Sequence, residues 1–304
     1  MGRYDVLDKR YFSDPERFAE LIEVGILKRR EKINPEKLVK LDGIYESLRS
    51  VTGEYERDGL KLYEDHRVKY GVEIEKNSDL RMTSRISIYD MCEYEKSAAD
   101  RKAVHKKKKD YRDFSELKSG KVSDEKEYPI VNVVLYVGMG RYKGSRSMAD
   151  EFYELPSRVK PFLQSKIQNY SFTLMEADYV NPMDFETELR QFFEAMQARN
   201  DKARLLELFD SKEYQELSTD TKKIIAIHLD NKELIKKVVE EEVEMCKAIR
   251  DMIRDSKEEG LAEGSNSMTN LYVKLKASNR LDDWEKAIYD VDYKNKLLSE
   301  LVYV

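Results

Sequence analysis

The sequence predicts an α/β fold followed by an all-helical C-terminal region, and three patterns carry this prediction. Residues 67–76 alternate between apolar and polar side chains, as in a strand with one buried face. Residues 130–137 and 171–175 are largely apolar or β-branched, as in parallel strands that are covered on both faces. After about residue 183 the strand patterns end, and apolar residues recur at helical spacing.

Composition and charge narrow the class of protein. The 304 residues include 40% hydrophobic and 38% charged residues, with few glycines and prolines, which excludes a mainly disordered or fibrous chain. Lys and Arg number 55 against 60 Asp and Glu, so the net charge of −5 does not by itself indicate a polyanionic partner. The two cysteines lack metal-ligand spacing, and no leader or long apolar window occurs. We therefore expect a cytoplasmic protein that is neither secreted nor membrane-spanning, with domains 1–199 and 200–304.

The N-terminal residues predict a helix and then a β-hairpin. The residues Ser-Asp-Pro-Glu at 13–16 form a helix start, and the helix that follows has an apolar stripe with Glu20 on its flank. Two stretches with β character follow at 55–63 and 67–76, linked by a polar turn. The two stretches are therefore predicted to pair as neighbouring strands.

The middle of the chain predicts a helix, a basic segment and a strand–helix–strand unit. Residues 81–101 carry apolar side chains along one side and are predicted to be helical. Residues 102–109 contain five lysines, and we interpret them, with the polar residues up to 126, as a mobile basic loop. The apolar runs that follow are joined by a helical connection with two prolines, which implies an α/β unit. The basic segment either contacts the phosphates of a nucleic acid or faces solvent, and its candidate DNA-binding residues are Lys106, Lys107, Lys108 and Lys109.

The C-terminal third predicts helices only. Short packed helices occupy 192–224, and an amphipathic helix spans 231–259 on a strongly charged background. This longer helix either forms an oligomer seam, which makes a homo-oligomer through the C-terminal helices, or packs on its own domain. A last helical pair follows at 271–276 and 282–301. The three histidines are scattered, and we interpret them as surface or core residues.

Three acidic residues form the candidate catalytic constellation. Asp58 lies on the first predicted strand, and Glu73 and Glu75 share one face of the second. Cross-strand neighbours on one face come within about 5 Å, so the three carboxylates can converge. Oxygen-only ligands suit Mg²⁺ or Mn²⁺, whereas zinc prefers His or Cys. The alternative is that these acids lie on a solvated face of the sheet, since the chain has many acidic residues.

Short motifs along nearly the whole chain resemble, in their order, those of the Rpn family. These proteins are recombination-promoting nucleases, also described as transposases, of the PD-(D/E)xK nuclease superfamily. The N-terminal motifs are DKRYFSD (8–14), FAEL (18–21), ERD (56–58), GVEIE (71–75), YPIV (128–131), LYVG (135–138) and GSRSM (144–148). The C-terminal motifs are MCKA (245–248), AEG (262–264) and DDWEKA (282–287).

The resemblance implies a PD-(D/E)xK restriction-endonuclease-like core of order αβββαβ, with a mixed sheet flanked by helices. It also implies metal-dependent cleavage of DNA, linked to mobile DNA or phage defence. By position, Asp58 and Glu73 would ligate Mg²⁺ or Mn²⁺, and Glu75 would add ligation or orient the attacking water. Glu20 falls near a helix acid that some members contribute to the metal. The implied partner is therefore DNA, and the implied cofactor is a divalent cation.

Glu75 departs from the family pattern, which has Gln or Lys at this position. A carboxylate lacks the positive charge with which a lysine stabilises the transition state, and Lys76 points to the other face of a regular strand. Two alternatives to an active nuclease therefore stay open. One is a catalytically degenerate nuclease that binds DNA or regulates, and the other is an interaction module whose helical tail carries the function.

Overall fold

The computed structural model describes residues 3–46, 54–229, 267–278 and 280–301, together with Leu234, Lys247 and Arg254. The chain divides into two units, Met1–Asn231 and Lys232–Val304. The first unit contains a mixed sheet flanked by helices, and the second is helical in its described residues. The predicted α/β class and the helical C-terminal region are therefore confirmed.

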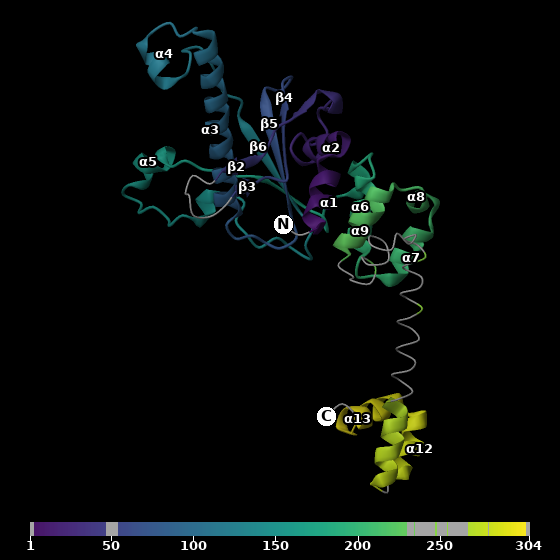
Figure 1. The fold of residues 1–304 in the computed structure, drawn as a ribbon. Helices are drawn as coiled ribbons and strands as arrows, with labels where there is room; N and C mark the ends of the chain where they lie inside the picture. Colours follow the sequence, from purple (N-terminus) through teal and green to yellow (C-terminus); the bar gives the residue numbers. More distant parts are fainter. Residues whose placement is uncertain are drawn as a thin grey trace. The chain divides into compact units, whose positions relative to one another are not determined.

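A mixed sheet forms the centre of the first unit. The strands span Leu38–Lys40 (β1), Ile44–Glu46 (β2), Glu54–Glu56 (β3), Gly59–Tyr63 (β4), Val68–Glu75 (β5), Ile130–Tyr136 (β6) and Thr173–Glu176 (β7). In the described residues, five of them form one sheet in the order β1-β4-β5-β6-β7 (Figure 1). β1, β4 and β5 pair antiparallel, whereas β6 is parallel to both β5 and β7. β2 and β3 form a separate antiparallel ribbon that is inserted between β1 and β4 in the chain.

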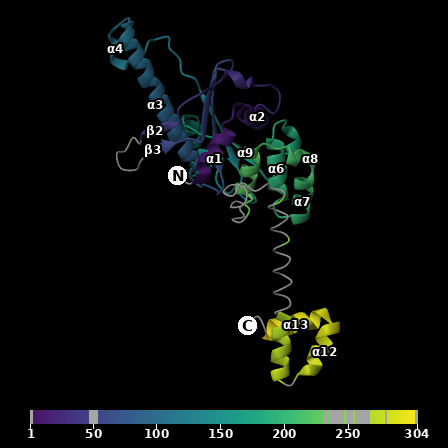
Figure 2. The ribbon, with the colours of Figure 1, turned by 45° about the vertical axis from the view of Figure 1, so that its right-hand side comes forward.

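Helices cover both faces of this sheet. α2 (Pro15–Gly25) begins where the sequence predicts, with the Asp14 side chain accepting hydrogen bonds from the backbone N–H groups of Glu16 and Arg17. α3 (Met82–Lys108) lies on the opposite face, as both views show (Figure 1, Figure 2). Residues 133–136 of β6 are therefore all buried, although their side chains alternate between the two faces. This confirms the doubly covered parallel strand.

The predicted strand 55–63 is interrupted. β3 ends at Glu56 in the ribbon, and β4 begins at Gly59 in the main sheet, so residues 57–58 belong to neither strand. The hairpin itself is as predicted, because β4 turns through residues 64–67 into β5 with Gly59 opposite Val72. The interruption places Arg57 and Asp58 at the point where the chain passes from the ribbon to the sheet.

The helix α3 is longer than predicted, which corrects the mobile basic loop. Lys106, Lys107 and Lys108 are helical, and the helix ends at Lys109 with a backbone φ of 53° in the left-handed region. Lysine is a good helix former, and cations near a helix C-terminus interact favourably with the helix dipole. A short helix, α4 (Phe114–Ser119), follows.

The helices after residue 183 pack against the N-terminal helix. They are α6 (Leu189–Ala198), α7 (Lys202–Asp210), α8 (Lys212–Gln215) and α9 (Thr219–His228), and the N-terminal helix is α1 (Arg3–Phe12). The ring of Phe192 lies 5.5 Å from Phe12 and 5.7 Å from His228, measured between centroids. His228 also lies 2.8 Å from the Asp8 carboxylate, between Nε2 and Oδ1. α9 packs on α1, and both helices belong to the unit Met1–Asn231.

Short helical turns complete the first unit. The connection between β6 and β7 contains such turns instead of one long helix, and its prolines at 156 and 161 agree with this. The turns of the unit are η1 (Pro35–Lys37), η2 (Met148–Glu151), α5 (Lys160–Leu163), η3 (Gln164–Lys166) and η4 (Pro182–Asp184).

The second unit contains a helix at 267–277, α12 (Leu281–Tyr289) and α13 (Val291–Leu301). The predicted helix 282–301 is therefore divided at Asp290. Leu271, Leu275, Ala287 and Leu297 form its buried cluster. The predicted amphipathic helix 231–259, with its oligomer seam, lies largely outside the described residues. In the part of the chain that is described, no helix is both long and apolar enough to cross a membrane.

Replacing Phe192 with alanine tests whether α6 and α9 belong to the core of the first unit. The side chain is fully buried against α1 and α9, so Phe192→Ala should lower the free energy of unfolding by about 3–5 kcal/mol. Val6→Ala is the control, because Val6 is 55% exposed and its loss should change stability by about 0.5 kcal/mol or less. Urea unfolding followed by circular dichroism measures both. Equal midpoints for the two variants would contradict the packing.

Candidate functional site

Asp58 is anchored to the strand that carries the two glutamates. Its Oδ2 accepts a hydrogen bond of 2.8 Å from the backbone N–H of Ile74. Ile74 lies between Glu73 and Glu75 on β5, and the pairing of Gly59 with Val72 places Asp58 beside this part of the strand. The structure therefore places Asp58 beside the part of β5 that carries Glu73 and Glu75.

The two glutamates face α3, and the acid cluster is largely buried. Glu73 is 1% exposed, so this face of the sheet is covered rather than solvated. Burial raises the pKa of Glu73 to about 8, and the negative charge of Asp58 acts in the same direction, whereas Arg57 and Arg85 oppose it. Burial also raises the pKa of Asp58 and of Glu75. Clustered acids with raised pKa values are typical of functional sites.

Arg85 of α3 supplies a positive charge within the acid cluster. Its Nη2 pairs with Oε1 of Glu75 and lies 3.8 Å from Oε2 of Glu73. Its Nη1 lies 3.0 Å from Oδ2 of Asp79. One nitrogen of the guanidinium group is thus shared by the two glutamates of β5.

Arg57 holds the other side of Glu73. Its side chain is fully buried, with Nε 3.4 Å from Oε1 of Glu73 and Nη2 3.0 Å from Oδ1 of Asp90. Nη2 also donates to Oδ1 of Asn132 at 2.5 Å. Gly71 leaves room for this arrangement, since a Cβ there would lie 2.2 Å from Oδ1 of Asn132. Arg57 therefore joins β5, β6 and α3 through buried polar contacts.

These contacts form part of a buried polar layer between α3 and the sheet, which consists of Arg57, Lys69, Glu73, Asp90, Glu93 and Asn132. At the other end of the layer, Nζ of Lys69 donates to Oε1 of Glu93 at 2.8 Å and to Oγ of Ser97 at 2.6 Å. Buried charges need such partners, because an unpaired one loses its hydration without compensation. The layer therefore sets how α3 lies on the sheet.

The sequence reasoning missed Arg57, Arg85 and the polar layer. A signal was present, because polar residues or glycine occupy alternate positions of β5 from Lys69 to Glu75. Asp90 and Glu93 are three residues apart and share one side of α3. Only apolar positions were used to identify the buried side of that helix, so its polar inner side was not recognised.

Glu20 is committed to a different contact. Its Oε1 accepts a hydrogen bond from the backbone N–H of Glu186, and Oε2 accepts one from the backbone N–H of Thr187 at 3.2 Å. The hydroxyl of Thr187 donates to the same carboxylate. Glu20 thus fastens α2 to the segment before α6, and its contacts are not with the acid cluster.

The four lysines predicted to bind DNA lie at the far end of α3. At 1.5 Å per helical residue, Lys106 is roughly 30 Å from Arg85 along the helix. Figure 1 shows α3 carrying α4 away from the sheet. Lys106 and Lys109 line a surface pocket of about 460 Å³ together with Phe114. These lysines are therefore remote from the acid cluster.

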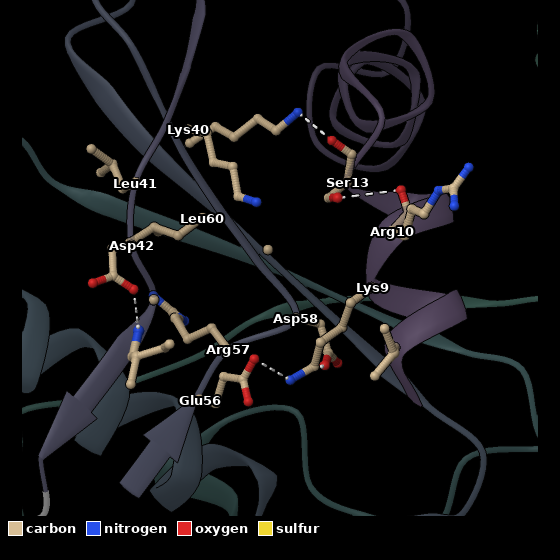
Figure 3. Close-up of a pocket in the computed structure, with 15 residues that line it drawn as sticks. Lys9, Arg10, Ser13, Lys40, Leu41, Asp42, Glu56, Arg57, Asp58 and Leu60 are labelled. Carbon is tan, nitrogen blue, oxygen red and sulfur yellow. Dashed lines mark hydrogen bonds and ion pairs between the residues drawn. The ribbon is translucent and has the colours of Figure 1, made fainter. Parts of the chain in front are cut away.

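A second pocket, of about 380 Å³, opens beside Asp58 between α1, the link from β1 to β2 and the link from β3 to β4 (Figure 3). Its wall includes Lys9, whose Nζ lies 3.0 Å from Oε1 of Glu56 and 3.7 Å from Oδ1 of Asp58. The Asp58 side chain is 19% exposed. The acid cluster is therefore accessible from this pocket through Asp58.

The donor set suits a hard dication such as Mg²⁺ or Mn²⁺, because Asp58, Glu73 and Glu75 offer carboxylate oxygens only. Within the residues that the structure describes, no three His, Cys, Asp or Glu side chains are gathered at the spacing of a metal site. The guanidinium group of Arg85 lies against the two glutamates instead. A dication held by Asp58 and Glu73 would therefore compete with Arg85 for the Glu73 carboxylate.

No protein-family model, curated protein or solved structure matches the chain. The role of each site residue must therefore follow from its own contacts. Those contacts consist of a buried acid cluster, two arginines that oppose its charge and an adjoining pocket with both basic and acidic side chains in its wall.

Replacing Glu73 with glutamine tests its raised pKa. Between the ordinary value of 4.5 and about 8 only the folded state keeps the proton on Glu73, so wild-type stability should fall as pH rises through this window. Each pKa unit corresponds to about 1.4 kcal/mol, so the loss should reach a few kcal/mol. Glu73→Gln should remove this part of the pH dependence.

Urea unfolding at pH 5 and pH 8.5 in EDTA measures the effect. Glu64→Gln, a change at an exposed residue of the β4–β5 turn, is the control and should retain the wild-type dependence. If Glu73→Gln shows the same dependence as wild type, Glu73 titrates at an ordinary pH.

Proposed function

We propose that the chain is a metal-dependent DNA endonuclease that hydrolyses phosphodiesters at Asp58, Glu73 and Glu75. The hydrogen bond from the Ile74 N–H to Asp58 carries this proposal, because it holds the third carboxylate next to the glutamate pair. The order of the elements also supports it: α2, β1, β4, β5, α3 and β6 follow the αβββαβ order of the PD-(D/E)xK core. A role in mobile DNA or phage defence and a cytoplasmic location belong to the same proposal.

Asp58 and Glu73 are the residues that would hold Mg²⁺ or Mn²⁺. A bound ion of this kind supplies charge neutralisation and a more acidic water molecule. Glu75 would orient the attacking water, and its raised pKa would make it a better proton acceptor at neutral pH than an ordinary carboxylate. These assignments keep the roles that the resemblance to the Rpn family implies.

Arg85 provides the cation that Glu75 cannot provide. A guanidinium group binds carboxylates and phosphates with the same fork geometry. When a phosphodiester lies beside Glu75, Arg85 can therefore exchange a carboxylate for a phosphate oxygen. In that position it would stabilise the negative charge that develops on the phosphate during hydrolysis.

The second candidate is a catalytically degenerate nuclease fold that acts as a DNA-binding, regulatory or protein-interaction module. The position of Arg85 favours it as well, because Nη2 contacts both glutamates and so serves as a built-in counter-ion. In this case the arginine would replace the metal permanently.

A plasmid-cleavage assay tests whether the protein is an active endonuclease. The wild type should nick supercoiled DNA with Mg²⁺ or Mn²⁺, and Asp58→Asn should reduce the rate by roughly 100-fold or more, since even residues outside the metal ligands contribute about 10- to 100-fold. Asp124→Asn is the control, because that side chain is 72% exposed. Equal cleavage by wild type and Asp58→Asn would rule out the proposed site.

Replacing Arg85 with glutamine distinguishes the two candidates. In an active nuclease, Arg85→Gln should lower the cleavage rate by roughly 100-fold, while Mn²⁺ binding measured by calorimetry should become tighter because a competing charge is removed. In a degenerate nuclease, the wild type should neither cut nor bind Mn²⁺, and Arg85→Gln should gain Mn²⁺ binding alone. Arg81→Gln, at an exposed residue just before α3, should behave as wild type.

A further inference from the structure

The acids in the wall of the pocket beside Asp58 are engaged in ion pairs. Glu56 pairs with Lys9 at 3.0 Å, and Asp42 pairs with Lys96 at 3.0 Å. Two further lysines of the wall form a cross-strand pair in the main sheet, and one of them, Lys40, also helps to lower the pKa of Asp42.

That pair consists of Lys40 on β1 and Lys61 on β4, which lie directly opposite each other in the antiparallel register. Like charges at such positions destabilise a sheet. Lys61 is only 3% exposed, and its Nζ donates to the Ser13 carbonyl oxygen at 2.6 Å and lies 4.7 Å from the Phe18 ring centroid. Both of these neighbours are uncharged. Burial lowers the pKa of Lys61 to about 8, Lys40 adds to this effect, and Asp14 opposes it only in part.

The size and position of the pocket indicate which anion would complete this pair. A volume of about 380 Å³ is within the range of small-molecule sites. Figure 3 shows Lys9 and Asp58 at one end of the pocket and Lys40 and Ser13 at the other. Along one strand of a nucleic acid a phosphate recurs about every 3.4 Å of helix axis. Lys61 follows Asp58 by three residues, which is roughly 10 Å along an extended chain. A strand with one phosphate at Asp58 would therefore bring a later phosphate of the same strand near the two lysines.

We propose that this pocket binds a backbone phosphate further along the strand that carries the scissile one, with Lys40 and Lys61 as its ligands. The inference rests on the proposed function, because it takes Asp58 as the cleavage point. It assigns substrate positioning to the edge of the sheet, and it accounts for a like-charged cross-strand pair that weakens the unbound protein.

Binding of a fluorescein-labelled single-stranded oligonucleotide in EDTA tests the proposal without cleavage. Lys40→Gln should weaken binding by about tenfold at 50 mM salt and should lower the salt dependence by about one phosphate contact. Lys37→Gln is the matched control, because Lys37 is exposed three residues earlier and pairs with Asp65. Lys61→Met should weaken binding in the same way if circular dichroism shows an unchanged fold. Without DNA, Lys40→Gln should raise the unfolding temperature, since it removes the repulsion.

The outcomes separate this inference from the proposed function. Weaker binding by Lys40→Gln but not by Lys37→Gln supports the pocket, even if the wild type fails to cut plasmid. If Lys40→Gln and Lys37→Gln bind the oligonucleotide equally well, the proposed phosphate site is wrong, even if the wild type cuts plasmid. A third outcome is that inorganic phosphate binds in a Lys40-dependent way but does not compete with the oligonucleotide. This result would contradict the proposal, because the pocket would then be a site for free phosphate.

Discussion

The charge balance of the buried polar layer determines the geometry of the first unit. Arg57 is fully buried and contacts Glu73 on β5, Asn132 on β6 and Asp90 on α3. A buried guanidinium group without such partners would be strongly destabilising, so the contacts fix the position of α3 over the two strands. Because Arg85 is part of the same helix, its placement against the glutamates follows from this packing. The packing of the core therefore determines the arrangement of the acid cluster.

The environment of the acid cluster disfavours the charged form of its carboxylates. Burial raises the pKa of each of Asp58, Glu73 and Glu75, whereas the Ile74 N–H, Lys9, Arg57 and Arg85 act in the opposite direction. A main-chain hydrogen bond holds Asp58 in place, so the cluster does not depend on side-chain packing alone. Such an arrangement weakens the folded state relative to an apolar core of the same volume. Clustered acids with raised pKa values are typical of functional sites, and this supports the hydrolytic site that we propose.

Local patterns predicted the elements that depend on local physics. The start of α2, the alternation of β5, the doubly covered β6 and the helices after residue 183 are all visible in residue spacing. The break at residues 57–58 is not, because the choice between two sheets depends on partners distant in sequence. α3 was predicted too short because its second half has no apolar stripe and is stabilised by helix-forming lysines. The Asp58 cluster could be anticipated from strand pairing, whereas the role of Arg57 depends on Asn132 and Asp90, which no spacing rule connects to it.

The absence of a side chain at Gly71 makes the residues at several contacting positions depend on one another. A methyl group there would collide with Asn132 and crowd Arg57. Loss of Arg57 would leave the buried carboxylates of Glu73 and Asp90 without their positive partner. Substitutions at contacting residues are strongly non-additive, so each of these changes would be harmful alone and tolerable only with the others. Homologous chains should therefore preserve or lose the group together, and independent drift at one of its members should be rare.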